Sequence, residues 1–209
     1  MKQYNSTPSK GYTLMEVLVV TAIVSILGIV ISKFQRDVFS FNRYFSTSLS
    51  TGDSAQKLLR PMTAEIRSAS PSNNGAYPID AVADYSFSFY SDIDNDGLKD
   101  WVRYTLSGTT LSKETIKPTG SPLVYNTANK VTNVFMTGVR NITDSIPLFT
   151  YYDETYVGDS GGVVSPTTGL LSSIRLVGVK IRLDPGQSQS LKTTEVSTQV
   201  AIRNLKIQQ

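Results

Sequence analysis

The chain has 209 residues, of which 40% are hydrophobic and 18% are charged, and its formal net charge is +3. It contains no cysteine and no histidine, which excludes disulfide bonds, thiolate or imidazole metal sites, and catalytic triads built on either residue. Two of its basic residues, Lys2 and Lys10, lie in an N-terminal segment without acids, so the rest of the chain is close to neutral. We therefore expect one domain of moderate size with a core of its own, no direct binding of nucleic acid, and no enzymatic activity.

An apolar run over residues 12–31 follows a basic and polar segment, residues 1–11. An α-helix rises about 1.5 Å per residue, so about 20 residues cross a hydrocarbon core of about 30 Å. The run therefore predicts a membrane-spanning helix over residues 12–33. Positive charge lies on both flanks, at Lys10 and at Lys33, so the flanks alone orient the helix only weakly. The small-residue cleavage site of an ordinary secretory signal does not follow the run.

The junction reads Lys10-Gly11-Tyr12-Thr13-Leu14-Met15-Glu16-Val17-Leu18 and resembles the class III signal of type IV prepilins and type II secretion pseudopilins. In that family a membrane-embedded prepilin peptidase cuts after the glycine on the cytoplasmic side and N-methylates the new amino terminus. Carried over by position, the resemblance implies a leader peptide over residues 1–11, a cut between Gly11 and Tyr12, and methylation of Tyr12. The family usually has phenylalanine as the first mature residue, and Tyr12 keeps the aromatic ring while adding a hydroxyl.

Glu16 places a carboxylate inside the predicted span, which costs about 2.5 to 3.5 kcal/mol at mid-membrane on insertion scales. Four helical steps from Tyr12, it is expected about 6 Å inside the new terminus, where the cost is smaller. The resemblance implies that Glu16 meets the amino terminus of a neighbouring subunit during assembly, in a charge-assisted hydrogen bond. The alternative is a carboxylate tolerated near the lipid headgroups of a simple signal-anchor.

A helical pattern continues beyond the span, and we expect an extramembrane amphipathic helix over residues 34–69. Its apolar stripe comprises Phe34, Val38, Phe41, Phe45, Leu49, Ala55, Leu59, Met62 and Ile66. The charged residues expected to face water are Lys57, Arg60, Glu65 and Arg67. Gly52 lowers helix stability and Pro61 removes a backbone donor, so the sequence predicts a kink near either residue or a division of the helix at Pro61.

After the turn signal at residues 71–75 the periodicity changes from helical to alternating, which predicts a β domain over residues 70–209. The strands expected from alternation cover residues 85–89, 101–106, 146–152, 174–183 and 196–202. The predicted fold class is α+β, with a long N-terminal helix packed on an antiparallel β-sheet. This arrangement is similar to pilins, and its loose patterns resemble the larger minor pilins and minor pseudopilins.

An acidic segment between two predicted strands is the candidate metal site. Its carboxylates are Asp92, Asp94, Asp96 and Asp100, and a glycine after the third allows a tight reversal of the chain. Alternating carboxylates followed by glycine can converge oxygen ligands on Ca²⁺, as in an EF-hand loop, where Asp100 would act through water. The position of the bidentate glutamate holds Arg103 instead, and strands are expected to flank the segment. The alternative is a hairpin turn whose carboxylates are solvated.

Two classes of function remain open. In the first, the chain is a structural minor subunit of a type IV pilus-like filament or type II secretion pseudopilus, assembled by packing of its N-terminal helix. Its expected partners are prepilin peptidase, other pilins or pseudopilins, the inner-membrane assembly platform and membrane lipid, with the C-terminal domain outside the cytoplasm. In the second, it is a signal-anchored surface receptor or adhesin that does not polymerise, with residues 92–100 and the polar loop 158–173 as its binding surface. No cofactor other than the candidate Ca²⁺ is expected.

Overall fold

The computed structural model describes residues 11–158, 161–166, 170–184 and 193–205, with all their side chains except those of residues 43–55 and 58. The predicted leader, apart from Gly11, lies outside the described residues. The side chains of Phe45, Leu49 and Ala55 in the predicted stripe are outside them too, as are parts of the loop 158–173.

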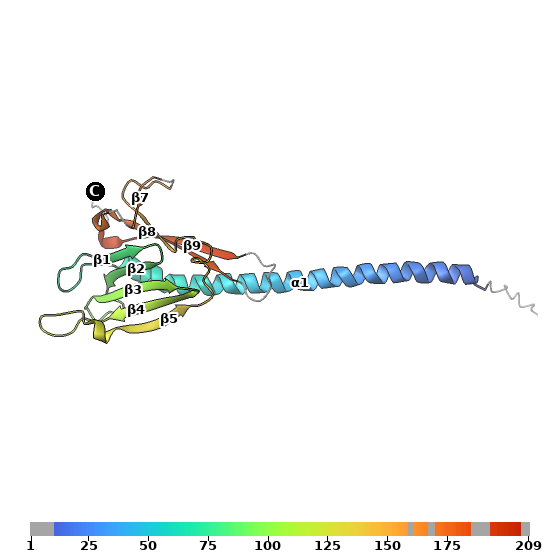
Figure 1. Cartoon of the computed structure of the whole chain (residues 1–209), viewed down its shortest axis with the longest axis horizontal. Coiled ribbons are helices and arrows are strands. Elements are labelled where there is room, and N and C mark those ends of the chain that lie inside the picture. Colours follow the sequence, from blue (N-terminus) through green and yellow to red (C-terminus); the bar gives the residue numbers. More distant parts are fainter. Residues whose placement is uncertain (1–10, 159–160, 167–169, 185–192, 206–209) are drawn as a thin grey trace, which may run out of the picture. The chain divides into compact units, whose positions relative to one another are not determined.

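The chain divides into two compact units, Met1–Ser46 and Thr47–Gln209. The helix α1, Leu14–Arg67, contributes to both units (Figure 1). This division differs from the boundaries predicted at residues 33 and 69, because the C-terminal part of the helix supplies side chains to the core of the second unit.

α1 is continuous through Gly52 and Pro61, so the predicted division of the helix at Pro61 is wrong. Proline lacks the backbone donor for the carbonyl four residues earlier, which here belongs to Lys57. Lys57 is an exposed residue, so the carbonyl left without this donor belongs to a solvated part of the helix. A bend at Gly52 or Pro61 stays a prediction.

Nine strands form two antiparallel sheets in the described part of the chain, where the sequence predicted one sheet (Figure 1). The five-stranded sheet has the order β1-β2-β3-β4-β5, formed by Ile79–Ala83, Ser86–Ser91, Asp100–Ser107, Thr110–Ile116 and Val131–Met136. The four-stranded sheet has the order β7-β6-β8-β9, formed by Val163–Val164, Phe149–Tyr152, Leu176–Leu183 and Thr194–Ala201. Short 3₁₀ helices lie at Thr127–Asn129, Leu171–Ser173 and Arg203–Leu205.

The predicted strands correspond to β2, β3, β6, β8 and β9, whereas β1, β4, β5 and β7 were not predicted as strands. Three of the missed strands, β1, β5 and β7, lie at sheet edges. In the fourth missed strand, β4, most side chains are half-buried, so its two faces differ little in exposure. Alternation is a clear signal only where one face is buried and the other is solvated. The two residues of β7 fall inside the segment expected to be loop.

Both sheets and the C-terminal part of α1 share one hydrophobic core. The helix contributes Leu59, Met62 and Ile66, as its stripe predicts, and the latter two have no exposed surface. Each such side chain stabilises the fold by about 1.5–3 kcal/mol relative to exposure. The packing of the amphipathic helix segment on β structure, expected from the sequence, is therefore confirmed within the second unit.

Glu65 was expected to face water, and this prediction is wrong. Its carboxylate accepts a hydrogen bond of 2.7 Å from the Tyr104 hydroxyl in β3 and one of 2.6 Å from the Lys113 ammonium in β4. The pKa of Tyr104 lies well above its usual range. Burial is the largest cause of this rise, and the negative charge of Glu65 adds to it. Because Tyr104 is buried, its hydroxyl needs an acceptor, and Glu65 supplies it from the helix.

Tyr151 in β6 ties the two sheets together through its hydroxyl. The hydroxyl donates to the carbonyl oxygens of Ala83, at 2.8 Å, and Ser86, at 3.2 Å, which belong to the β1–β2 hairpin of the other sheet. Replacing Tyr151 with phenylalanine should lower the free energy of unfolding by about 1–2 kcal/mol, because a buried hydrogen-bonding group is lost. Urea unfolding of the full chain in nonionic detergent, followed by the fluorescence of its single tryptophan, Trp101, measures this.

The matched control is Tyr77→Phe. Tyr77 is an exposed residue, and its hydroxyl donates to the Ser172 carbonyl oxygen at the long distance of 3.5 Å. Its removal should change the free energy of unfolding by less than about 0.5 kcal/mol. Equal losses in the two variants would show that Tyr151 does not hold the sheets together through its hydroxyl.

Candidate functional site

The predicted cleavage junction lies in an exposed, non-helical stretch immediately before α1. Gly11, Tyr12 and Thr13 precede the first helical residue, Leu14, and Tyr12 is 82% exposed. Apart from Gly11 itself and its two chain neighbours, no atom lies within 4 Å of the position that a Cβ would take at Gly11. The backbone at this junction is therefore accessible to a peptidase.

Thr13 caps the N-terminus of α1, a role that sequence reasoning missed. The backbone N–H of Glu16 donates to the Thr13 hydroxyl at 3.3 Å and to its carbonyl oxygen at 3.1 Å. The local signal was present, because Thr-x-x-Glu is the capping-box pattern. Glu16 consequently lies in the first turn of the helix, where a negative charge complements the helix dipole.

The first part of α1 is apolar around its whole circumference. Large hydrophobic side chains between Leu14 and Ile31 each expose about half of their surface or more, so the first unit leaves them uncovered. The hydroxyls of Thr21 and Ser25 donate to carbonyl oxygens of the same helix, at 3.0 and 2.7 Å, which satisfies them without water. The segment Leu14–Asn42 is long and apolar enough to cross a membrane.

The acidic segment forms the loop of the β2–β3 hairpin. Asp92, Asp94 and Asp96 each present a carboxylate oxygen within 4.8 Å of the others. The chain reverses through Asn95 and Gly97, whose φ angles are 60° and 88°. These values lie in the left-handed region that asparagine and glycine tolerate best. The three alternating carboxylates predicted as metal ligands are therefore brought together.

Asp100 differs from the other three carboxylates because it is the first residue of β3 and only 1% exposed. Its side chain shares the core face of β3 with Val102 and Tyr104. Its pKa is raised to about 6, and burial is the largest cause. The negative charges of Asp94 and Asp96 add to the rise, whereas the positive charge of Lys117 partly offsets it. The carboxylate is thus close enough to the acidic loop to be affected by its charge.

Lys117 is a member of this cluster that the sequence did not suggest. Its ammonium donates to Asp94 and lies 3.6 Å from Asp96 Oδ2, and the bond from Lys117 lowers the pKa of Asp94. The register of β3 and β4 explains this contact: Ile116, the last residue of β4, pairs with Trp101, so Lys117, which follows the strand, lies beside the loop. A second ammonium, that of Lys99, lies 3.4 Å from Asp92 Oδ2.

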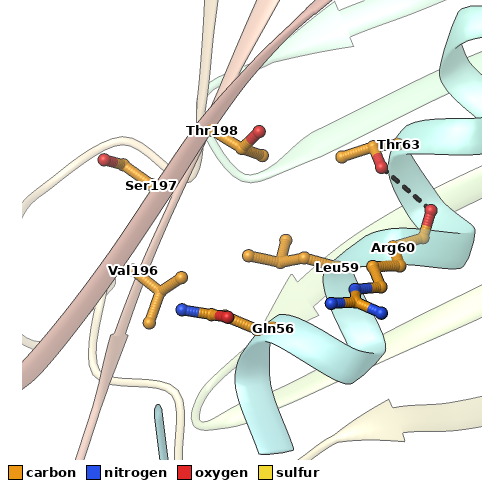
Figure 2. Close-up of a pocket in the computed structure, with 7 residues that line it drawn as sticks. All are labelled: Gln56, Leu59, Arg60, Thr63, Val196, Ser197 and Thr198. Atoms are coloured by element: carbon orange, nitrogen blue, oxygen red, sulfur yellow. Dashed lines mark hydrogen bonds between the residues drawn. The ribbon is translucent and has the colours of Figure 1, made fainter. Parts of the chain in front are cut away.

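A shallow groove of about 250 Å³ lies between α1 and β9 within the second unit (Figure 2). Its lining residues are Gln56, Leu59, Arg60, Thr63, Val196, Ser197 and Thr198. The Thr63 hydroxyl is already engaged, since it donates to the Arg60 carbonyl oxygen at 2.9 Å, as Figure 2 shows. Among the described residues that line the groove there is one cation and no carboxylate, so this surface offers contacts rather than acid–base chemistry.

Residues 7–32 match the family model described as Prokaryotic N-terminal methylation motif. The chain therefore carries a class III signal of the type IV pilin and pseudopilin kind, which implies processing by a prepilin peptidase and assembly with other pilins. Proteins of this kind are structural rather than catalytic. Together with the apolar part of α1, the motif makes this a membrane-anchored protein with one candidate span in the described chain. No curated protein matches the chain.

Proposed function

We propose that this chain, which carries a class III signal on an apolar helix, is a minor subunit of a type IV pilus-like filament or of a type II secretion pseudopilus. Prepilin peptidase removes residues 1–11 and methylates Tyr12. The subunit then leaves the membrane for a bundle of sister helices. The observation that carries the proposal is the uncovered apolar surface of α1 from Leu14 to Ile31, directly after an accessible Gly11–Tyr12 junction.

The helix surface supports assembly because it is apolar on all sides. A helix of this kind is stable only when lipid or other helices surround it. Packing in a filament replaces lipid contacts with contacts between helices, which close-packed apolar side chains favour through dispersion. The β domain of the second unit stays outside this bundle and selects the neighbouring subunits. The sequence patterns of this domain, which resemble those of the larger minor pilins, support a minor subunit.

Glu16 is proposed to direct the order of assembly. In the first turn of α1 it lies next to the terminus that cleavage creates, and the free amine of an adjacent subunit is its partner of opposite charge. An ion pair beside lipid is weakly screened, so it selects the register at which one helix stops sliding along another. The assembly platform and the motor are separate proteins.

Co-expression with a prepilin peptidase tests the proposal. The expected product begins at Tyr12 with one added N-methyl group, as read by intact-mass and N-terminal peptide mass spectrometry. Gly11→Val should abolish processing, because a branched side chain is brought to the scissile bond. The variant should leave the fold intact, since nothing lies within 4 Å of a Cβ at this position.

Gly28→Ala is the matched control, because Gly28 also has no neighbour within 4 Å of a Cβ and lies inside α1. This variant should be processed like the parent chain. A protein that keeps Met1 in the presence of active peptidase would contradict the proposal and favour a signal-anchored receptor that does not polymerise.

A further inference from the structure

We propose that the β2–β3 hairpin binds one Ca²⁺ ion through the carboxylates of Asp92, Asp94, Asp96 and Asp100. Two independent observations carry this inference. Three of the carboxylates converge at the loop, and the fourth is buried at its base without a hydrogen-bond partner. The inference does not depend on whether the chain assembles into a filament.

The three loop carboxylates are held close together although they repel one another. Their oxygens lie within 4.8 Å of each other, a spacing that one ion with metal–oxygen distances of about 2.3–2.6 Å can bridge. Backbone N–H groups fix two of the side chains: that of Gly97 donates to Asp92 at 3.1 Å, and that of Leu98 donates to Asp96 at 2.8 Å. The loop therefore arranges the ligands before an ion arrives, which lowers the entropic cost of binding.

Asp100 provides the second observation. It is 1% exposed, and neither of its carboxylate oxygens makes a hydrogen bond of ordinary geometry with another described residue. Oδ1 of Asp92 is likewise buried without such a bond. Asp100 pairs with Ser91 in the register of β2 and β3, so it lies at the base of the loop that holds the other three carboxylates. A buried carboxylate without partners is costly unless a cation compensates it.

The charges of the cluster match a divalent cation. Two ammonium groups, those of Lys99 and Lys117, contact the three loop carboxylates, and Asp100 adds a fourth negative charge. When the ion displaces Lys117 into solvent, four carboxylates and Lys99 leave three negative charges, an excess that a divalent cation reduces. The donor set consists of oxygens alone, which favours Ca²⁺ or Mg²⁺ over metals that prefer nitrogen or sulfur. Ca²⁺ accepts the irregular arrangement of a loop and a strand end, whereas Mg²⁺ demands near-octahedral geometry and keeps most of its water.

Lys117 competes with the proposed ion for the carboxylates of Asp94 and Asp96. Its ammonium contacts two of the proposed ligands, and its side chain is 59% exposed, so it can swing into solvent when the ion binds. Arg103, which holds the place of the bidentate glutamate in an EF-hand, belongs to the opposite face of β3 and lies over the Trp101 ring. It therefore does not block the ion.

Titration of the purified full chain with CaCl₂ in nonionic detergent tests the site. Calorimetry should show one Ca²⁺ bound per chain with a Kd of about 10⁻⁵ to 10⁻³ M. At 100 times the Kd, the thermal midpoint followed by Trp101 fluorescence should rise by about 5–10 °C. Absence of both heat and a thermal shift at millimolar Ca²⁺ would overturn the inference. An equal response to MgCl₂ at the same concentrations would overturn the assignment to Ca²⁺.

Variants separate ion binding from a purely structural role. Asp94→Asn and Asp100→Asn should each weaken Ca²⁺ binding by about tenfold or more, because affinity follows the charge of the ligands. Asp100→Asn should also raise the thermal midpoint in the absence of Ca²⁺, since it removes a buried charge. Lys117→Met should tighten binding by about fivefold.

Glu154→Gln is the control, because it changes an exposed carboxylate outside the hairpin. This variant should bind Ca²⁺ like the parent chain. Weakening of the same size in Glu154→Gln would contradict the proposed site.

Discussion

Replacing Phe87 with alanine should lower the free energy of unfolding by about 3–5 kcal/mol. Phe87 has no exposed surface and belongs to β2 of the five-stranded sheet. Its ring centroid lies 5.2 Å from that of Phe89 and 5.7 Å from those of Phe149 and Tyr151. The last two belong to β6 of the other sheet, so the substitution opens a cavity where the sheets meet.

The expected loss corresponds to a fall of about 6–20 °C in the thermal midpoint of a domain of this size. Thermal unfolding of the full chain in nonionic detergent, followed by Trp101 fluorescence, measures it. Val134→Ala serves as the control, because Val134 in β5 is 67% exposed and its truncation should cost less than about 0.5 kcal/mol. A loss below about 1 kcal/mol for Phe87→Ala would show that these rings do not join the two sheets.

Glu16→Leu should reduce incorporation of the processed subunit into filaments by about 10–100-fold. A hydrogen bond to a charged group contributes about 1.5–3 kcal/mol, and each 1.4 kcal/mol changes an equilibrium about tenfold. The measurement compares the variant in sheared filaments with the variant in membranes, in cells that lack the parent chain. Mass spectrometry of the amino terminus verifies that processing has occurred.

Two further substitutions distinguish the assembly role of Glu16 from its place in the capping box. Glu16→Gln keeps a side chain that suits the third helical position but removes the charge, so it should assemble as poorly as Glu16→Leu. Thr13→Ala removes the cap and keeps the charge, so it should assemble within a few-fold of the parent. Normal incorporation of both Glu16 variants would refute the proposed ion pair.

The sequence predicted the N-terminal features well because they depend on local order. A helix long enough to span a bilayer, the class III signal and the first-turn glutamate all lie within about twenty consecutive residues. The stripe containing Met62 and Ile66 was equally clear, since spacings of three and four define one face of a helix. The central strands β3 and β8 were recognised because only one of their faces is solvated.

Other features depended on contacts between residues far apart in the chain. Glu65 follows the pattern of a surface residue, yet it is the acceptor for the buried Tyr104 hydroxyl across the core. Edge strands such as β5 show four exposed residues in succession, so no alternation marks them. The second sheet was hidden for the same reason, because strands β6 to β9 give no sign of whether they extend the first sheet or begin another.

By itself the sequence determined a membrane-spanning apolar helix behind a class III signal, an α+β domain and a row of alternating aspartates, because each is a pattern along the chain. The tertiary structure alone decided that the β domain has two sheets with one core, that Asp100 is buried beneath the acidic loop, and that Lys117 meets Asp94. Strand register and sheet packing create these contacts, and hydrophobic burial shared among distant segments selects that register.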